Sequence, residues 1–151
     1  MPFFFFFIYM VNMYEKSALE AVTTTDQVLV ADDLLNFATN TVLTGCSIAH
    51  VAGSNTIRLL KRGLYQVSVN VDVDPTAAGE IAIQLLNNGV AVPGALATVT
   101  GVAATTDNLA FTALVRVLPS CCAIDNTGSL QVQITAAGTV SNANIVVVKE
   151  A

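Results

Sequence analysis

His50 is the one histidine of this 151-residue chain, and imidazole is the commonest general base near neutral pH. Serine-type hydrolysis needs such a histidine beside an acid and an activated nucleophile. The sequence holds no Gly-x-Ser-x-Gly segment, which would present a nucleophilic serine on a sharp turn. We therefore expect His50 to be a hydrogen-bonded structural residue, and we expect the chain not to be an enzyme.

The three cysteines are an odd number, so at least one thiol stays unpaired within a single chain. Cys121 and Cys122 are adjacent, and on an extended strand their side chains point to opposite faces. A zinc site built from this pair with Cys46 and His50 is therefore not expected. We interpret residues 121 and 122 as small buried thiols. A bond between Cys46 and Cys122 across two sheets, and the redox state of all three thiols, stay open.

The carboxylates occur as Asp32-Asp33 and as Asp72-x-Asp74. The second pair shares a strand face and could join Glu80 in holding calcium, which prefers oxygen ligands. No Asp-rich loop surrounds the pair, so solvated positions on a strand are the simpler interpretation, and calcium binding stays open. The sequence selects no carboxylate pair for glycoside hydrolysis and holds no glycine-rich phosphate loop. We expect no cofactor and no metal.

The clearest structural element that could position such residues is the segment from Gly63 to Pro75, GLYQVSVNVDVDP. Its odd positions from Tyr65 to Val73 are apolar, and the positions between them are polar. Side chains alternate between the two faces of a strand, so the pattern predicts a long strand with one face on a core and one in water. Pro75 has no backbone N–H to donate and ends the strand.

Shorter segments of the same kind fill the rest of the chain and indicate about ten strands without helical periodicity. Asn88-Gly89 is the strongest hairpin signal, because both residues tolerate positive φ. Thr39-Asn40-Thr41 is expected to be a polar break, and Pro93-Gly94 to end a strand. Besides the central strand, we predict strands at 17–24, 27–31, around Cys46 to His50, and at 56–60, 80–86, 90–92, 95–99, 108–118, 121–126, 129–135 and 144–150, with 34–37 as a short apolar segment. The fold class is an all-β sandwich of two sheets.

Two of these strands are apolar on both faces. Asn108 to Leu118 carries apolar residues at its odd positions and Leu114 and Leu118 on the other face. Ile145 to Val148 is apolar without interruption. Strands of this kind are usually covered on both sides. In a two-sheet domain the second cover has to come from another subunit.

The composition supports subunit contacts, since 54% of residues are hydrophobic and only 11% are charged, against about 25% charged residues in an average domain. Such a chain either buries apolar surface between subunits or covers its exterior with small polar residues, and we expect both. The net charge is −5, and the six Lys and Arg residues are scattered along the chain. Without a basic stripe we expect no nucleic-acid binding.

The amino terminus, MPFFFFFIYMVNMYEK, contains an apolar run from Phe3 to Val11. This run is too short to span a bilayer, which needs about 20 residues. No positive charge precedes it and no small-residue cleavage site follows, so it does not resemble a secretory signal peptide. We expect residues 1–13 to be an extension outside the fold, with Met10 and Met13 as alternative starts, and residues 14–151 to be one domain. The alternative is an apolar plug that inserts into a neighbouring subunit or larger assembly.

The order of segments KRGLYQVSVNVDV, EIAIQLLNNGVAVPG, NLAFTALVRVLPSCCAIDN, SLQVQITAAG and NIVVVK resembles the tumour-necrosis-factor and complement-globular-head jelly roll. The Gly-x-Tyr opening of the central strand and the Asn-Gly hairpin are the best markers. The form that it resembles is the one in bacterial and phage proteins, including the heads of collagen-like spore-surface proteins and domains of Firmicutes and their phages. The similarity covers about residues 14–151.

This resemblance implies an antiparallel jelly roll of about ten strands, assembled as a homotrimer about a threefold axis. It also implies a structural, adhesive or receptor-binding role on a virion, spore or bacterial cell surface. The chain has no Gly-x-y tract, so it is expected to be a free trimer or a decoration piece docked on a capsid, fibre or surface-layer protein through its amino terminus. An adhesin-like head that binds a glycan or receptor through the loops 76–79 and 100–107 is the alternative. The residues expected at the trimer interface are Tyr65, Phe111, Leu114, Leu118, Val146 and Val148.

Overall fold

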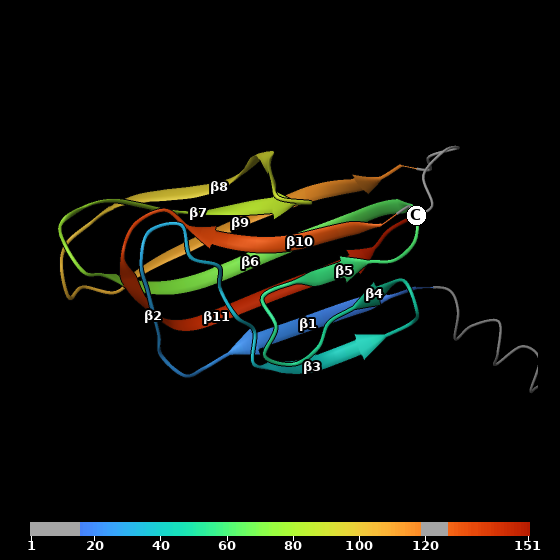
Figure 1. Ribbon diagram of the computed structural model, residues 1–151, viewed down its shortest axis with the longest axis horizontal. Coiled ribbons are helices and arrows are strands. Elements are labelled where there is room, and N and C mark those ends of the chain that lie inside the picture. The colour runs from blue at the N-terminus through green and yellow to red at the C-terminus, as the bar shows by residue number, and fades with distance from the viewer. Residues whose placement is uncertain (1–15, 119–126) are drawn as a thin grey trace, which may run out of the picture.

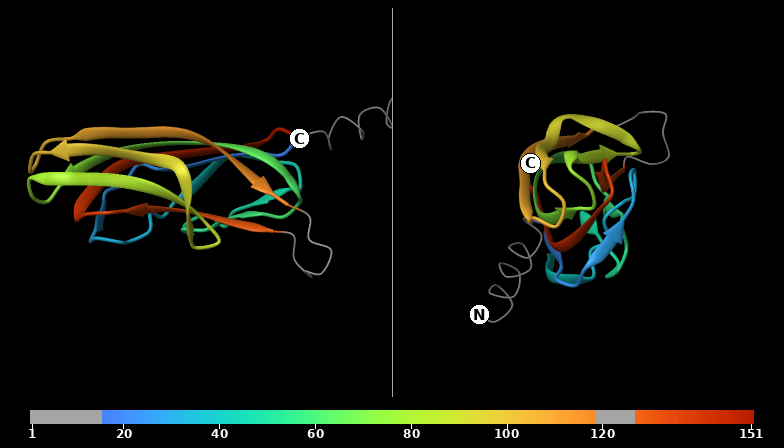
Figure 2. Two further views of the ribbon diagram at one scale, coloured as in Figure 1. Left: turned by 90° about the horizontal axis from the view of Figure 1, so that it is seen from above. Right: turned by 90° about the vertical axis from the view of Figure 1, so that its left-hand side faces the viewer.

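The computed structural model describes residues 16–118 and 127–151. These residues form two antiparallel sheets packed face to face (Figures 1 and 2). The strands are β1 (Ala18–Thr23), β2 (Gln27–Leu29), β3 (Thr39–Thr44), β4 (Ile48–Ala49), β5 (Ile57–Leu59), β6 (Gly63–Pro75), β7 (Gly79–Asn87), β8 (Val90–Gly101), β9 (Asp107–Val117), β10 (Gly128–Ile134) and β11 (Gly138–Lys149). Sheet A has the order β3-β1-β11-β6-β9, with β2 also paired to β11, and sheet B has the order β4-β5-β10-β7-β8. This confirms the predicted all-β two-sheet sandwich.

β6 has the bounds that the sequence predicts, and it pairs with β9 from Gly63 to Val73 and with β11 from Tyr65 to Pro75. Its apolar positions from Tyr65 to Val73 are 0–2% exposed and face sheet B. Its polar positions between them face outward from sheet A. Between the sheets, these side chains meet the inward positions of the other strands in one continuous apolar core. Burial of such Val, Leu and Ile side chains contributes about 1.5–3 kcal/mol each, which makes the core the main source of stability.

Two predicted boundaries are wrong, and each error has a local cause. The polar segment at 39–41 is not a break but part of β3, an edge strand whose outward side chains meet water and need not be apolar. β11 begins at Gly138, whereas the sequence predicts a start at 144. The first half of this strand carries Ser and Asn on its outward face and therefore lacks the apolar run of its second half. The short apolar segment 34–37 is not one of the strands and makes an isolated bridge from Leu34 to Gln133.

The hairpin at Asn88-Gly89 is confirmed, with φ of 54° and 79° at its two residues. Pro93-Gly94, however, does not end a strand. β8 continues to Gly101 through an irregularity opposite Gln84, where the register with β7 shifts. The side-chain amide of Gln84 donates to the carbonyl oxygens of Val92 at 3.1 Å and of Ala95 at 3.0 Å. It thereby replaces ladder hydrogen bonds that the bulged backbone does not make.

Several expectations lie outside the described residues: the extension at 1–13, the alternative starts at Met10 and Met13, and the strand and thiols at 121–126. In the described part of the chain, no helix is long and apolar enough to cross a membrane.

Tyr65 gives a direct test of the core. Its ring is fully buried, and its hydroxyl donates to the carbonyl oxygen of Lys61 at 2.6 Å. A Tyr65→Phe substitution keeps the ring but leaves that carbonyl without its donor, so we expect the free energy of unfolding to fall by about 1–2 kcal/mol. Urea unfolding followed by circular dichroism measures the change. A variant as stable as the wild type would show that the hydrogen bond contributes nothing.

The same residue predicts a loss of stability in alkali. Burial raises the pKa of Tyr65, although hydrogen bonds with the Lys61 backbone and the Ser47 side chain lower it in part. In the unfolded chain a tyrosine loses its proton near about pH 10. The unfolded state therefore gains stability first as pH rises above that value, and we expect the wild type to lose more stability between about pH 8 and about pH 11 than the Tyr65→Phe variant does. Urea unfolding of both proteins at the two pH values tests this, and equal losses would contradict it.

Candidate interaction surface

His50 lies at the end of β4, buried beneath Phe37, with the two rings 6.5 Å apart and edge to face. Its Nε2 donates to the carbonyl oxygen of Ser54 at 3.0 Å, and its Nδ1 lies against Oδ1 of Asn40. The amide nitrogen of Asn40 in turn donates to the carbonyl oxygen of His50 at 2.9 Å. Both ring nitrogens are therefore engaged by the same chain. This is the structural histidine that the sequence predicts, and the ring is not placed to act as a general base.

The carboxylates of Asp72 and Asp74 lie on the outward face of β6, where neighbouring side chains donate to them. The amide nitrogen of Asn108 lies 2.7 Å from Oδ1 of Asp72, and the Thr106 hydroxyl lies 2.5 Å from Oδ1 of Asp74. Within residues 16–118 and 127–151, no group of three His, Cys, Asp or Glu side chains could hold a metal ion. Glu80 is exposed at the start of β7 and does not complete a calcium site with the pair.

Cys46 is exposed in the bend before β4, and the Lys61 ammonium donates to its sulfur at 3.4 Å. It does not share a buried face with Ile48 and His50, because the strand starts only at residue 48. The other possible ligands of a zinc site, Cys121 and Cys122, lie outside the described residues.

After these side chains, the next candidate site is a surface, the outward face of sheet A. Strand register arranges its side chains in rows that cross β9, β6, β11 and β1. One row runs Leu114, Gln66, Val148, Ala18, and the next runs Thr112, Ser68, Val146, Glu20. Further along the strands come Ala110, Asn70, Asn144, Val22, and then Asn108 and Asp72 with Asn142. The face is therefore apolar towards the end where the C-terminus lies (Figure 1) and becomes a network of amide and hydroxyl groups towards the other end.

The structure places the six predicted interface residues in four settings. Leu114 and Leu118 are exposed, at 61% and 63%, on or just beyond the outward face of β9. Val146 and Val148 are half-buried on the outward face of β11. Phe111 points inward at the edge of the sandwich, where it packs partly against the core. Tyr65 is fully covered by its own chain, so it has no surface to give to a partner, and its assignment to an interface is corrected.

Outward-pointing apolar side chains are typical of surfaces that another protein covers. Glu20 is the only charged side chain in the rows of Leu114 and Thr112, and the next row towards the C-terminus contains Arg116 opposite Leu64. A pocket of about 360 Å³ opens farther along the face between β6 and β9, lined mainly by small polar side chains such as Ser68 and Thr112. This face of sheet A can therefore pack against a complementary protein surface.

The six Lys and Arg residues are scattered along the sequence, but the fold brings three of them together. Lys149, Arg116 and Arg62 lie far apart in the chain, yet they line one pocket at the end of the sandwich where β9 and β11 finish and β6 begins. The signal for this grouping lies in the strand directions, since the residue before β6 and the last residues of β9 and β11 meet at one end of an antiparallel sheet. The residue pattern of any single strand does not predict this grouping of cationic side chains.

No protein-family model and no curated protein sequence matches the chain. Solved structures match its fold. A crystal structure of murine APRIL superposes with a TM-score of 0.67 at 13% identity, covering 90% of this chain and 100% of that one. The globular domain of zebrafish complement 1qA gives 0.64 at 7% identity, covering 87% and 94%. The PRD1 vertex protein P5 gives 0.56 at 16% identity, covering 89% and 97%. The fold is thus the TNF-like jelly roll that the sequence resemblance implies.

The structural assignment of His50 can be tested by substitution. His50→Ala removes the donor to the Ser54 carbonyl and the partner of Asn40, and we expect the free energy of unfolding to fall by about 1–3 kcal/mol. Val51→Ala, next in the chain and 77% exposed, is the matched control and should change stability by less than about 0.5 kcal/mol. Urea unfolding of both variants gives the two values. Equal stability of the His50→Ala variant and the wild type would refute the structural role.

Proposed function

We propose that this protein is a non-enzymatic structural head that assembles as a homotrimer and decorates a virion, spore or bacterial cell surface. The observation that carries the proposal is the exposed apolar end of the outward face of sheet A. Leu114 and Leu118 are both more than 60% exposed in the single chain, beside Val146 and Val148. The resemblance to the TNF-like family implies a threefold assembly, which would cover such a face.

Burial energetics favour this proposal over a monomer. Covering an exposed Leu or Val side chain contributes about 1.5–3 kcal/mol, and a homotrimer would bury three copies of each such side chain, one in every subunit. The charge content points the same way, because only 11% of residues are charged and few of them stand on this face. A chain with so few charges is kept soluble most simply when its apolar surface is shared between subunits.

The surface role is supported by likeness alone. The PRD1 match is named as a vertex protein, and the complement match as a globular domain. We infer a similar display role here, with the segment before residue 16 as the connection to a capsid, fibre or surface-layer protein. The affiliation with the Firmicutes and phage branch belongs to the same proposal.

Ligand binding through the loops at the far end of the sandwich is the second candidate. The loops after β6 and after β8 lie together, since the Ala104 amide donates to the Pro75 carbonyl oxygen at 3.3 Å. They carry Thr, Ala, Val and Asp but no aromatic ring on which a sugar could stack. The composition of these two loops therefore favours a structural head over a glycan-binding one. A reproducible, saturable signal on a glycan array would reverse that order.

Light scattering tests the trimer. The 15.8 kDa chain should run at three times that mass, resistant to salt, whether translation starts at Met1 or at Met13. Leu114→Asp combined with Val148→Asp places two carboxylates in the apolar row, and we expect the mass to fall to that of a monomer because the buried charges would be unpaired. Val28→Asp, on an 81% exposed residue of β2, is the control and should stay trimeric.

A monodisperse wild-type monomer would overturn the trimer and leave the apolar row unexplained. A trimer that persists in the double variant would place the interface on another face. Turnover of a glycoside or ester that is lost in the His50→Ala variant would overturn the non-enzymatic role.

A further inference from the structure

The positive charge of this protein is gathered at one end of the sandwich. At this end β6 starts, β9 and β11 finish, and Tyr65 pairs with Lys149. β1 begins here too, opposite Val148, and β5 finishes here, with Leu59 opposite Gly128. All six cationic side chains of the chain lie in this half: Lys16, Arg58, Lys61, Arg62, Arg116 and Lys149. We call it the cationic end. The carboxylate side chains in this half, among the described residues, are Glu150 and Glu20, which lies in the row of Ser68 and Val146.

The opposite end is acidic. Asp107 pairs with Val73 where β9 starts and β6 finishes, and Gly79 pairs with Gly101 where β7 starts and β8 finishes. The loops around β2 reach the same end, with the Asp32 amide donating to the Ile134 carbonyl oxygen at 2.9 Å. The carboxylates at this end are Asp26, Asp32, Asp33, Asp72, Asp74, Glu80 and Asp107. No Lys or Arg of the described residues joins them.

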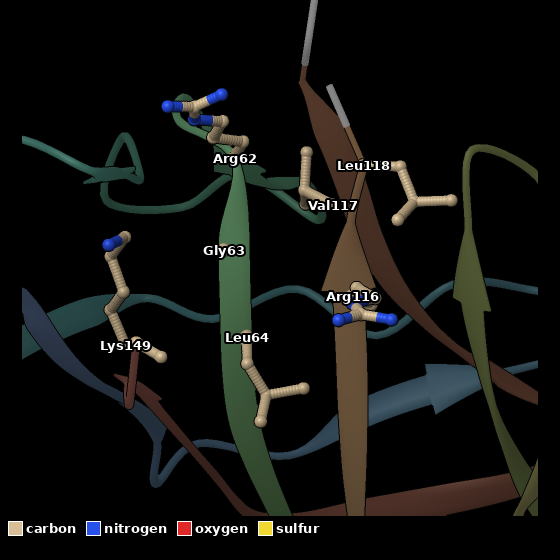
Figure 3. Close-up of a pocket in the computed structure, with 8 residues that line it drawn as sticks. Arg62, Gly63, Leu64, Arg116, Val117, Leu118 and Lys149 are labelled. Atoms are coloured by element: carbon tan, nitrogen blue, oxygen red, sulfur yellow. The ribbon is translucent and has the colours of Figure 1, made fainter. Parts of the chain in front are cut away.

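A pocket of about 460 Å³ lies at the centre of the cationic end. Figure 3 shows Arg62, Arg116 and Lys149 on three sides of the segment Gly63–Leu64, with Leu118 beside them. At the bottom of the pocket the backbone of Gly63 lies close to that of Ala151. Gly63 has φ of +149°, and a Cβ there would lie 2.3 Å from the carbonyl oxygen of Ala151. A side chain at residue 63 would clash with this backbone and with the Lys149 side chain, so glycine allows the C-terminal residues to approach β6 closely.

We propose that the cationic end is a docking surface for an acidic protein, whose Asp or Glu carboxylates enter this pocket. Two guanidinium groups and one ammonium group offer the donors that carboxylates pair with best. Leu64 and Leu118 give the pocket apolar walls, against which the methylene groups of an Asp or Glu side chain can pack.

The pocket fits a protein better than a nucleic acid or a bilayer. Its charges line a concavity that a single side chain can enter, whereas a duplex or a membrane presents phosphates on a broad surface. The seven carboxylates of the acidic end and the net charge of −5 also repel a dense polyphosphate at long range. Carboxylates along a peptide chain are spaced more widely than the charges of a duplex, which follow one another at about 1.7 Å, and they meet less of this repulsion.

The position of the docking surface agrees with the direction of the chain. Lys16, at which the described chain begins, lies at the cationic end, so the segment before it starts from that end as well. In the surface role proposed above, the cationic end would then face the platform and the acidic end would face outward. The binding of carboxylates by the pocket does not itself require the trimer.

Fluorescence anisotropy with labelled poly-L-glutamate tests the inference on the full chain. We expect binding at low ionic strength that weakens as salt rises, because salt screens exposed charges. Arg62→Gln, Arg116→Gln and Lys149→Gln together should weaken it about tenfold, as expected for three exposed ion pairs.

The matched control carries the same change in net charge at the other end. Thr76→Asp, Ala77→Asp and Ala78→Asp replace three exposed residues of the loop after β6 and should leave the affinity for poly-L-glutamate within about twofold. Light scattering and circular dichroism on every sample establish its mass and fold, so failure of the trimer and failure of the docking site are told apart.

Three outcomes would overturn the inference: no binding of poly-L-glutamate by the folded wild type, equal loss in both triple variants, or tighter binding to a DNA duplex or to phosphatidylserine vesicles than to poly-L-glutamate. Loss confined to the Arg62, Arg116 and Lys149 variant supports it.

Discussion

The pairing of β6 on both edges is the constraint on which the molecule depends. β11 holds one edge of β6 and β9 holds the other, so the register of β6 sets that of the strands beside it. A slip by one residue would turn Tyr65, Val67 and Val69 from the core to water and bring Gln66 and Ser68 inside. The alternation in one segment thereby fixes both the core and the outward face of sheet A.

The same register explains why one face has two characters. Strands of opposite direction bring the ends of β9 and β11 to the start of β6, so residues distant in sequence gather at shared ends. Apolar side chains and cations meet at the end where the chain leaves β11, while amides and carboxylates meet at the other. The apolar rows proposed for self-association and the charged end proposed for docking therefore meet, and Leu118 belongs to both.

The sequence predicts those features that depend on the residue pattern along a single strand or turn. β6, the Asn88-Gly89 hairpin and the two-sheet sandwich follow from alternation and turn chemistry. The structural role of His50 follows from the lack of a nucleophile motif in the sequence. β3 and the first half of β11 were missed, because an outward-facing strand can consist of Thr, Asn and Ser as readily as of Val. Tyr65 was misplaced since an aromatic ring on an alternating strand fits an interface and a core equally well. The cationic pocket could not be predicted, because it depends on the order of strands in the sheets.

The interruption in β8 has a consequence for how the protein avoids unwanted polymerisation. β8 is one of the two edge strands of sheet B, and Pro93 removes an amide from it while Gly94, with φ of +81°, turns the backbone aside. Gln84 then holds the displaced carbonyls from within. An extended foreign strand would find no regular series of donors and acceptors along this edge, so the bulge acts as a terminator of sheet growth. β3, an edge strand of sheet A, is interrupted as well, because its register with β1 shifts between Asn40 and Val42 and leaves Thr41 without a partner in the ladder.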